Sequence, residues 1–257
     1  MNLSDIRAEA WGVAREVATD DAFRLWTTAE MNRYINRVYR HIARETKCIR
    51  DAITPAVCQI ASAPPVNVGA LTTLAATDNM AAADLVQYND PNSWLYHQLV
   101  APRVYALHPS ILDIDECKWL AKPWKLIKVS VTKWQQNPWW EKVMGYPTEF
   151  CTDYQNNSIA LNYRTTATDT ILLTVRRLPL ADLANDNDIP EIRTNYHDFF
   201  LNGVLAQMYS KQDTQTFDGV NKTEYEAQFA ADIDMLKKQE TTLDQRLHCN
   251  GSMDAFR

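Results

Sequence analysis

The chain has 257 residues, of which 46% are hydrophobic and 23% charged, a composition typical of a soluble globular protein with one large domain or two small ones. Its net charge of −6 disfavours a protein whose main task is to coat nucleic acid, which requires clustered Lys and Arg. No apolar run approaches the roughly 18 residues of a membrane-spanning helix, and the first residues lack a secretory signal, so we expect a cytosol-like compartment and no membrane partner.

Two amphipathic helices are predicted near the start of the chain. The first begins after Ser4, a favourable N-cap residue, and carries apolar side chains at helical spacing. These are Ile6, Ala10, Val13 and Val17. The second begins after Thr27, which forms a capping box with Glu30, and ends near Thr46. Each helix has one apolar stripe and needs another element to cover it.

The second helix also carries a row of arginines beside its apolar stripe, at spacings of 4, 3 and 4 residues. They are Arg33, Arg37, Arg40 and Arg44. The simpler interpretation is a solvated face that forms ion pairs with Glu30 or Glu45. The alternative is a charged surface that contacts another subunit or faces nucleic acid.

From about residue 51 the composition changes. Residues 61–83 are rich in Ala, Pro, Thr and Asn without clear periodicity, which predicts a long loop or arm. Further on, alternating apolar residues predict three strands. The alternations are Ile127, Val129 and Val131; Ile159, Leu161 and Tyr163; and Ile171, Leu173 and Val175. The polar segment 165–170 is expected to be a hairpin loop between the last two strands.

This middle region contains six of the eight tryptophans: Trp94, Trp119, Trp124, Trp134, Trp139 and Trp140. Indole faces stack on sugars, so one interpretation is a carbohydrate-binding module. Trp139 and Trp140 would then be the exposed pair, because adjacent residues on a strand point to opposite faces. Large aromatic side chains also dominate cores and protein interfaces, and we favour that role.

Two more amphipathic helices are predicted after the polar run 185–188. Pro190 suits the first turn of the earlier one, and Asn221 with Glu224 suits the cap of the later one. The apolar residues of the earlier helix are Tyr196, Phe199, Phe200, Val204, Leu205 and Met208. Those of the later helix, close to a heptad spacing, are Tyr225, Phe229, Ile233, Leu236, Leu243 and Leu247.

No pattern indicates catalysis, a metal or a cofactor. The six glycines are isolated, so the chain has neither a phosphate-binding loop nor a nucleophile elbow. The five cysteines form no C-x-x-C pair and the five histidines show no ligand spacing, so we expect buried free thiols and structural histidines. A hydrolase that uses Asp113 or Asp115 is the weakest alternative, because these residues and Glu116 are more simply a solvated strand face or turn.

The economical architecture is α+β. Because none of the terminal helices can bury its apolar face alone, we expect residues 1–50 and 186–247 to form one helical bundle. Residues 51–185 would be a β-rich antiparallel insertion that includes the arm at 61–83. Residues 248–257 would be a C-terminal tail.

A series of short motifs runs from residue 26 to residue 210. The motifs are Trp26-Thr27 with Glu30, Tyr34-Ile35-Asn36 and Ala43-Arg44; Gly145-Tyr146-Pro147 with Phe150 and Asp153; Leu178-Pro179-Leu180-Ala181-Asp182-Leu183; and Ile189-Pro190-Glu191 with Tyr196 and Asp198. In order and spacing this set resembles phage head-to-tail adaptor (connector) proteins. The chain departs from their pattern at residues 61–83 and at Asn162-Tyr163-Arg164.

The resemblance implies a structural virion protein that is not an enzyme, made in the host cytoplasm and placed at the head–tail junction. It implies a ring, commonly a dodecamer, that joins the portal protein to a tail or nozzle protein and extends the DNA channel. DNA would pass without sequence-specific binding, which an acidic wall favours. Family members grip the portal with the C-terminal segment, which here includes Leu247, Met253, Phe256 and Arg257. The main alternative is a Trp-rich carbohydrate-binding tail module.

Overall fold

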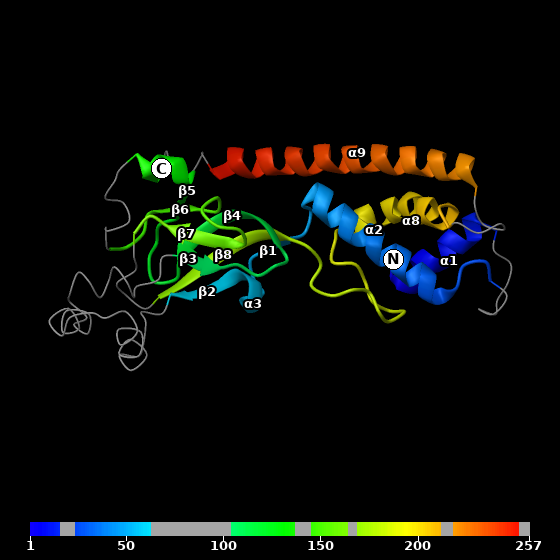
Figure 1. Ribbon diagram of the computed structural model, residues 1–257, viewed down its shortest axis with the longest axis horizontal. Helices are drawn as coiled ribbons and strands as arrows, with labels where there is room; N and C mark the ends of the chain where they lie inside the picture. The colour runs from blue at the N-terminus through cyan, green and yellow to red at the C-terminus, as the bar shows by residue number, and fades with distance from the viewer. Residues whose placement is uncertain (16–23, 63–103, 137–144, 164–168, 212–217, 252–257) are drawn as a thin grey trace, which may run out of the picture. The chain divides into compact units, whose positions relative to one another are not determined.

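The computed structural model describes residues 1–15, 24–62, 104–136, 145–163, 169–211 and 218–251 (Figure 1). The chain divides into two compact units, one of residues 1–50 and 176–257 and the other of residues 51–175. The first, the helical unit, is built from helices, and the second, the β unit, mainly from strands. The protein is therefore α+β, as the sequence predicts.

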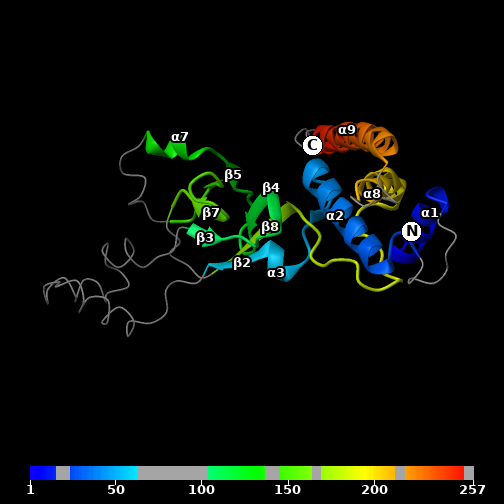
Figure 2. The same cartoon turned by 45° about the vertical axis from the view of Figure 1, so that its right-hand side comes forward.

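The helical unit takes its helices from both ends of the chain. They are α1 (Leu3–Val13), α2 (Thr28–Thr46), the 3₁₀ helix η3 (Thr194–Phe199), α8 (Phe200–Tyr209) and α9 (Gly219–Gly251). The helix α8 packs against α1, α2 and α9, and α2 also contacts α1 and α9. Figures 1 and 2 show these helices side by side from two directions.

The caps of the N-terminal helices explain where they begin. The α2 capping box is confirmed, since the Thr27 side chain accepts from the Glu30 N–H and the Glu30 side chain accepts from the Thr27 N–H. The N-cap of α1 is Asn2 rather than Ser4, because Asn2 and Asp5 form the reciprocal pair of hydrogen bonds that defines a capping box. The sequence prediction of Ser4 was therefore wrong by two residues.

The starts of the C-terminal helices also differ from expectation. Pro190 does not begin a helix, because the N–H of Glu191 next to it donates to the hydroxyl oxygen of Tyr39 at 2.6 Å. Helical structure begins only at Thr194. The last helix begins at Gly219, with the Asp218 carboxylate accepting from the N–H groups of residues 220 and 221 at 3.0 and 3.1 Å. The predicted cap at Asn221 and Glu224 is therefore wrong.

One hydrophobic core joins the helices of this unit. Its fully buried side chains come from α1, α2 and α8 and from η3, and α9 adds two more. They include Leu3, Ile6, Met31, Ile35, Tyr39, Ile42, Tyr196, Phe200, Val204, Met208, Ile233 and Leu236. The apolar stripes predicted for α2, α8 and α9 thus face one another, although Val13 of α1 is 44% exposed.

A side-chain amide ties α2 to the segment that returns from the β unit. The Asn36 amide nitrogen donates to the Leu183 carbonyl at 2.9 Å, and the Leu183 N–H donates to the Asn36 amide oxygen at 2.8 Å. Both residues are buried. Nearby, the buried Arg177 guanidinium pairs with Glu191 at 2.6 Å. The two Asn36 bonds satisfy backbone groups that water cannot reach, and the ion pair gives the buried guanidinium a partner.

The β strands form two sheets. The strands are β1 (Arg50–Asp51), β2 (Gln59–Ser62), β3 (Val104–Ala106), β4 (Ile111–Trp119), β5 (Ile127–Lys128), β6 (Glu149–Cys151), β7 (Ser158–Leu161) and β8 (Asp169–Arg177), with short helices α3 (Pro55–Cys58) and α7 (Val131–Gln135). One sheet has the order β1-β8-β2, with β4 also pairing with β8, and the other has the order β3-β7-β6-β5. Figure 2 shows these strands from the side on which α7 is visible.

The predicted strands are confirmed only in part. The strand β8 confirms the alternation at Ile171, Leu173 and Val175, all of which are buried. The hairpin expected between residues 161 and 171 is wrong, because β7 and β8 belong to different sheets. The insertion is also not purely antiparallel, since β5 pairs with β6 in parallel.

The strand predicted at 127–131 is shortened by a helix. Residues 131–135 form α7, whose N-cap Ser130 accepts from the Thr132 N–H. The Asp153 carboxylate holds the Val131 N–H at 3.0 Å and the Ser130 hydroxyl at 2.7 Å. These bonds take the backbone away from the sheet after two strand residues, and Ile127 is left 63% exposed.

A single core cluster joins the two sheets of the β unit and contains Trp119, Phe150, Ile159, Leu161 and Leu173. Trp119 donates to the Pro147 carbonyl at 3.2 Å, and Trp134, also buried, donates to Glu149 at 2.8 Å. Two of the tryptophans are thus core residues with satisfied N–H groups, as large aromatic side chains in cores usually are.

Of the predicted arm at 61–83, Ala61 and Ser62 belong to β2, and residues 63–83 lie outside the described residues. None of the helices in the described part of the chain is long and apolar enough to cross a membrane. Cys48, Cys58, Cys117 and Cys151 are free and buried, as expected.

Gly203 of α8 lies close to side chains of both α2 and α9, and its substitution tests the packing. A Cβ there would lie 2.8 Å from Val38 Cγ1 and 2.9 Å from Phe229 Cε2. We predict that Gly203→Ala lowers the free energy of unfolding by about 1–3 kcal/mol, because overpacking outweighs the better helix propensity of Ala. Urea denaturation measures the free energy of unfolding.

Gly12→Ala in α1 is the matched control, because nothing lies within 4 Å of its added Cβ. We expect this substitution to stabilise the protein by up to about 1 kcal/mol. A stabilising Gly203→Ala would contradict the packing.

The amide bridge of Asn36 gives a second test. We predict that Asn36→Leu lowers the free energy of unfolding by about 2–4 kcal/mol, because it leaves the buried N–H and C=O of Leu183 without partners. Thermal and urea unfolding measure the change. Gln207→Leu removes an exposed hydrogen bond to Arg37 and should change stability by less than about 0.5 kcal/mol. Equal effects of the two substitutions would show that the bridge contributes little.

Candidate interaction site

The arginine face is the row Arg33, Arg37, Arg40 and Arg44, and the structure brings all of these residues to one exposed side of α2. The opposite side of the helix carries the buried residues Met31, Ile35, Val38 and Ile42. An α-helix has 3.6 residues per turn, so residues three or four positions apart lie on the same side of it. The arginines therefore share one side of α2, and the apolar residues that enter the core share another.

The members of the arginine face differ in their partners. Arg37 donates to the Gln207 amide oxygen at 2.9 Å, and Arg40 pairs with Asp182 at 2.5 Å. Arg33 and Arg44 form no hydrogen bond or ion pair with any residue that the structure describes. Half of the face is therefore open to an external anion.

The ion pairs expected within α2 are not formed. Glu45 pairs with Lys237 at 2.9 Å, and this hydrogen bond lowers the pKa of Glu45. Glu30 pairs with Lys211 at 3.2 Å. Burial opposes ionisation of Glu30, but hydrogen bonds from Thr27 and Lys211 outweigh it and lower the pKa of Glu30. Both glutamates of α2 are committed to lysines of other elements, so the prediction that they neutralise the arginines was wrong.

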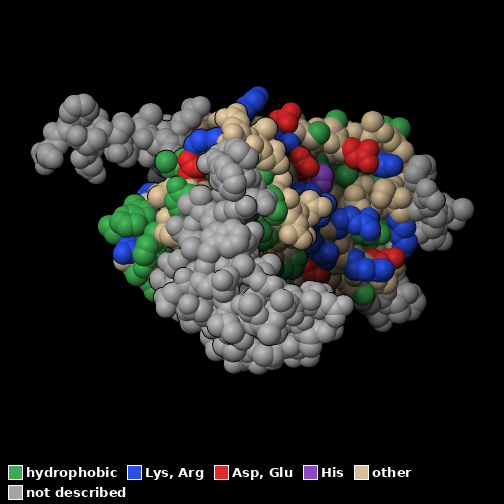
Figure 3. Space-filling model, turned by 60° about the vertical axis from the view of Figure 1, so that its left-hand side comes forward, with side chains coloured by type: hydrophobic (Ala, Val, Ile, Leu, Met, Phe, Trp, Pro, Cys, Tyr) green, Lys and Arg blue, Asp and Glu red, His purple; other side chains and the backbone are tan. Residues whose placement is uncertain are grey.

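The arginine face borders a cavity of about 410 Å³. Its lining residues are Arg33, Asn36, Arg37, Arg40, His41, Arg44 and Asp182. Only one of these, Asp182, is acidic, and Arg40 already pairs with it. Figure 3 shows Lys and Arg side chains gathered on one surface with a His side chain nearby.

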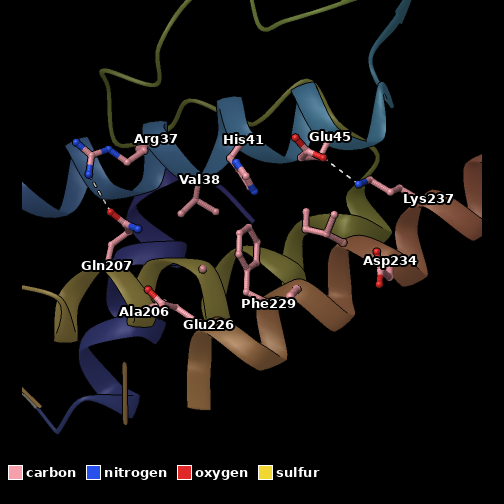
Figure 4. Close-up of a pocket in the computed structure, with 13 residues that line it drawn as sticks. Arg37, Val38, His41, Glu45, Ala206, Gln207, Glu226, Phe229, Asp234 and Lys237 are labelled. Atoms are coloured by element: carbon pink, nitrogen blue, oxygen red, sulfur yellow. Dashed lines mark hydrogen bonds and ion pairs between the residues drawn. The ribbon is translucent and has the colours of Figure 1, made fainter. Parts of the chain in front are cut away.

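A second cavity of about 490 Å³ lies between α2, α8 and α9 and shares Arg37 and His41 with the first (Figure 4). We call it the α2–α9 groove. Val38, Phe229 and Ile233 line its apolar part, and Figure 4 shows the phenyl ring of Phe229 pointing toward α2. The lining residues with charged side chains are Arg37, Glu45, Glu226, Asp234 and Lys237. The groove therefore has one cation and one carboxylate on α2, and one cation and two carboxylates on α9.

This arrangement suits the binding of anions. Guanidinium groups form planar, bidentate hydrogen bonds with carboxylates or phosphates. Within the described residues, no cluster of His, Cys, Asp and Glu could hold a metal ion. Burial raises the pKa of the Cys117 thiol to about 12, which keeps it protonated and unreactive. The residues offer anion recognition next to an apolar pocket.

The carboxylates considered for hydrolysis lie on β4. Asp113 pairs with Lys128 at 2.7 Å and Glu116 with Lys125 at 2.9 Å. Asp115 is exposed on the same strand. These are ion pairs at the edge of a strand, as the simpler interpretation of the sequence expects.

The other predicted site residues fall outside the described part of the chain. Trp139 and Trp140 belong to residues 137–144, and Met253, Phe256 and Arg257 to residues 252–257. The backbone of Leu247 lies in α9, but its side chain is outside the described residues. Their roles stay predictions.

Sequence reasoning missed two features. The first is the α2–α9 groove, for which the isolated Gly203 inside a helical pattern was the available signal. The second is an exposed aromatic pair on the β unit, in which the Lys122 ammonium lies 5.6 Å from the ring centre of Trp124 and 4.4 Å from that of Tyr146. Leu120, close by in sequence, is 64% exposed.

One comparison with known proteins identifies a family. The model of a family described as SU10 adaptor protein matches residues 1–248. No curated protein matches the chain. The family match includes residues of both the helical unit and the β unit and extends beyond residues 26–210, where the motifs were found. The chain therefore belongs to the SU10 adaptor protein family, a family of phage head–tail adaptors.

Proposed function

We propose that the protein is a structural subunit of a ring that joins the portal protein to the tail at the head–tail junction of the virion. The observation that carries this proposal is the family match over residues 1–248. The family is one of structural adaptors rather than enzymes. The subunit is made in the host cytoplasm, and the ring, commonly a dodecamer in such adaptors, extends the channel through which DNA leaves the head.

The body of the subunit is a helical bundle formed from residues 1–50 and 186–247. The core shared by α1, α2, α8 and α9 supports this assignment. A bundle of this kind keeps its shape when polar surfaces are engaged by neighbours, because its apolar stripes are already buried inside the unit. That is the property that a ring subunit needs.

Residues 51–185 form an insertion that presents contact surface to other proteins. The exposed Leu120, Trp124 and Tyr146 support this role, since aromatic and aliphatic side chains dominate the energetics of protein interfaces. Trp139 and Trp140, which lie outside the described residues, also contact other proteins in this proposal. Because Trp119 and Trp134 are buried, they cannot stack on sugars.

The tail of residues 248–257 grips the portal, with Leu247, Met253, Phe256 and Arg257 in contact. The long helix α9, Gly219–Gly251, includes the first four residues of this segment and is anchored in the core by Ile233 and Leu236. A short segment after an anchored helix can reach a separate protein without altering the packing of the unit.

The DNA that passes through the ring is not bound by sequence. A net charge of −6 per copy gives the ring an acidic character, which repels phosphates and keeps DNA from adhering to the wall. No cofactor is needed for this role.

Deletion of residues 248–257 tests the docking. We predict that the truncated chain has an unchanged circular dichroism spectrum and unfolding midpoint but no longer binds the portal protein of the same phage. Native mass spectrometry of the mixture measures docking. A full-length chain that never joins the portal would overturn the adaptor proposal, whereas a truncated chain that still docks would place the grip elsewhere.

Substitution of Trp139 and Trp140 by Ala separates an interface from a sugar-binding site. We predict that the double variant assembles less well with the tail protein, with an affinity loss on the order of tenfold or more. Glycan binding should be absent in both proteins. Glycan binding by the wild-type chain that is lost in the variant, with intact assembly, would favour a carbohydrate-binding module instead.

A further inference from the structure

We propose that the arginine face of α2 binds carboxylates of a second copy of this chain, and that Asp5 and Glu9 on α1 supply them. This inference rests on the proposed ring and names the surfaces through which neighbouring copies meet. It starts from the charged side chains that form no ion pair with the described residues of the same copy.

The positive charge of the arginine face is compensated only in part by residues that the structure describes, through the pair of Arg40 with Asp182. Both glutamates of the helix pair with lysines of other elements, and Arg33 and Arg44 have no partner in the described part of the chain. Like charges three and four residues apart on a helix repel one another. An anionic partner relieves this repulsion, and among the residues that the structure describes only Asp182, which pairs with Arg40, provides one.

Most carboxylates of the helical unit are already engaged. Asp182 pairs with Arg40, Asp186 with Arg7, Glu191 with Arg177 and Glu240 with Arg193. Glu9, like Asp198 and Asp234, is exposed and forms no hydrogen bond or ion pair with a described residue. Asp5 is exposed, and its carboxylate serves only the capping box with Asn2.

The spacing of the two surfaces is complementary. Asp5 and Glu9 are four residues apart, which places their carboxylates about 6 Å apart along one side of α1. Two pairs of the arginine face, Arg33 with Arg37 and Arg40 with Arg44, have the same spacing on α2. Antiparallel or parallel contact between two such helices brings each carboxylate next to a guanidinium.

The two surfaces lie on different helices and both face away from the core. On α1 the buried residues are Leu3, Ile6, Arg7 and Ala10, and Asp5 and Glu9 are on the exposed side. A surface that binds a different surface on the next copy is a heterologous interface, and such interfaces generate rings when the rotation closes.

Nucleic acid fits this surface less well. The α2–α9 groove next to the arginines is lined by the apolar side chains of Val38, Phe229 and Ile233, which another protein surface can cover and charged phosphates cannot. Copies of this chain, each with a net charge of −6, also repel one another overall. They therefore need a local positive surface to meet, and the arginine face provides it.

Charge reversal with rescue tests the inference on the full chain. We expect Arg33→Glu with Arg44→Glu to raise the dissociation constant for self-association by about tenfold or more. Glu9→Arg alone should have a similar effect and leaves the α1 capping box intact. Combining all three substitutions should restore much of the affinity. Sedimentation equilibrium at about 0.1 M salt measures these dissociation constants. At about 1 M salt, self-association should weaken only for proteins in which opposite charges face one another across the interface, such as the wild type and the triple variant.

Lys118→Glu with Lys238→Glu is the matched control. It changes the net charge by the same amount at exposed lysines that form no ion pair with described residues. We expect it to leave self-association close to that of the wild type. An equal loss in the control, unchanged self-association in the arginine variant, or no rescue by Glu9→Arg would each overturn the inference.

Two further measurements separate this inference from its alternatives. If the arginine variant self-associates normally but loses binding to a labelled DNA duplex that the wild type binds, the face contacts nucleic acid and the inference fails. If the arginine variant assembles normally on the portal protein, the inference fails while the adaptor function stands. If no protein joins the portal but self-association depends on the arginines, the adaptor function fails while the inference stands.

Discussion

The helical unit depends on one constraint, which is that α1 alone does not cover the apolar stripe of α2 and that α8 and α9, which complete the core, follow only after the β unit. Asn36 and Leu183, whose hydrogen bonds close this gap, are 147 residues apart. The entropy cost of such a closure grows only slowly with loop length, so burial of α2 against α8 and α9 can offset it. Each terminal pair of helices is therefore stable only in the presence of the other.

This constraint gives the β unit its independence. Its two sheets share a core of their own, in which residues of β4, β6, β7 and β8 meet. Because that core needs nothing from the helices, insertion of the β unit leaves the packing of the helical unit determined by α1, α2, α8 and α9. Exposed aromatic residues on the β unit can then be substituted without unfolding the helical unit. This suits a part of the chain that contacts other proteins.

The sequence predicted the features that depend on local chemistry. The Thr27–Glu30 box, the end of α2 and the alternation in β8 follow from side chains close in sequence, and the structure confirms them. The start of η3 could not be predicted, because Tyr39, far away in sequence, takes the Glu191 N–H. The helix α7 could not be predicted either, because the Asp153 carboxylate, distant in sequence, accepts a hydrogen bond from the Val131 N–H. Sheet membership of β7 and β8 likewise depends on long-range pairing that alternation alone does not contain.

For the candidate site, the period of α2 was sufficient to place the arginines on one exposed face. Their partners were not predictable, because Lys211 and Lys237 compete for Glu30 and Glu45 only after α8 and α9 have packed. That competition has a consequence for assembly. Closing the core joins the acidic residues of α2 to lysines of the same copy and leaves Arg33 and Arg44 without an ion pair to any described residue. A chain with a net negative charge thus acquires a positive surface only when it is folded, so the surface that we assign to assembly exists only after the helices from both chain ends have met.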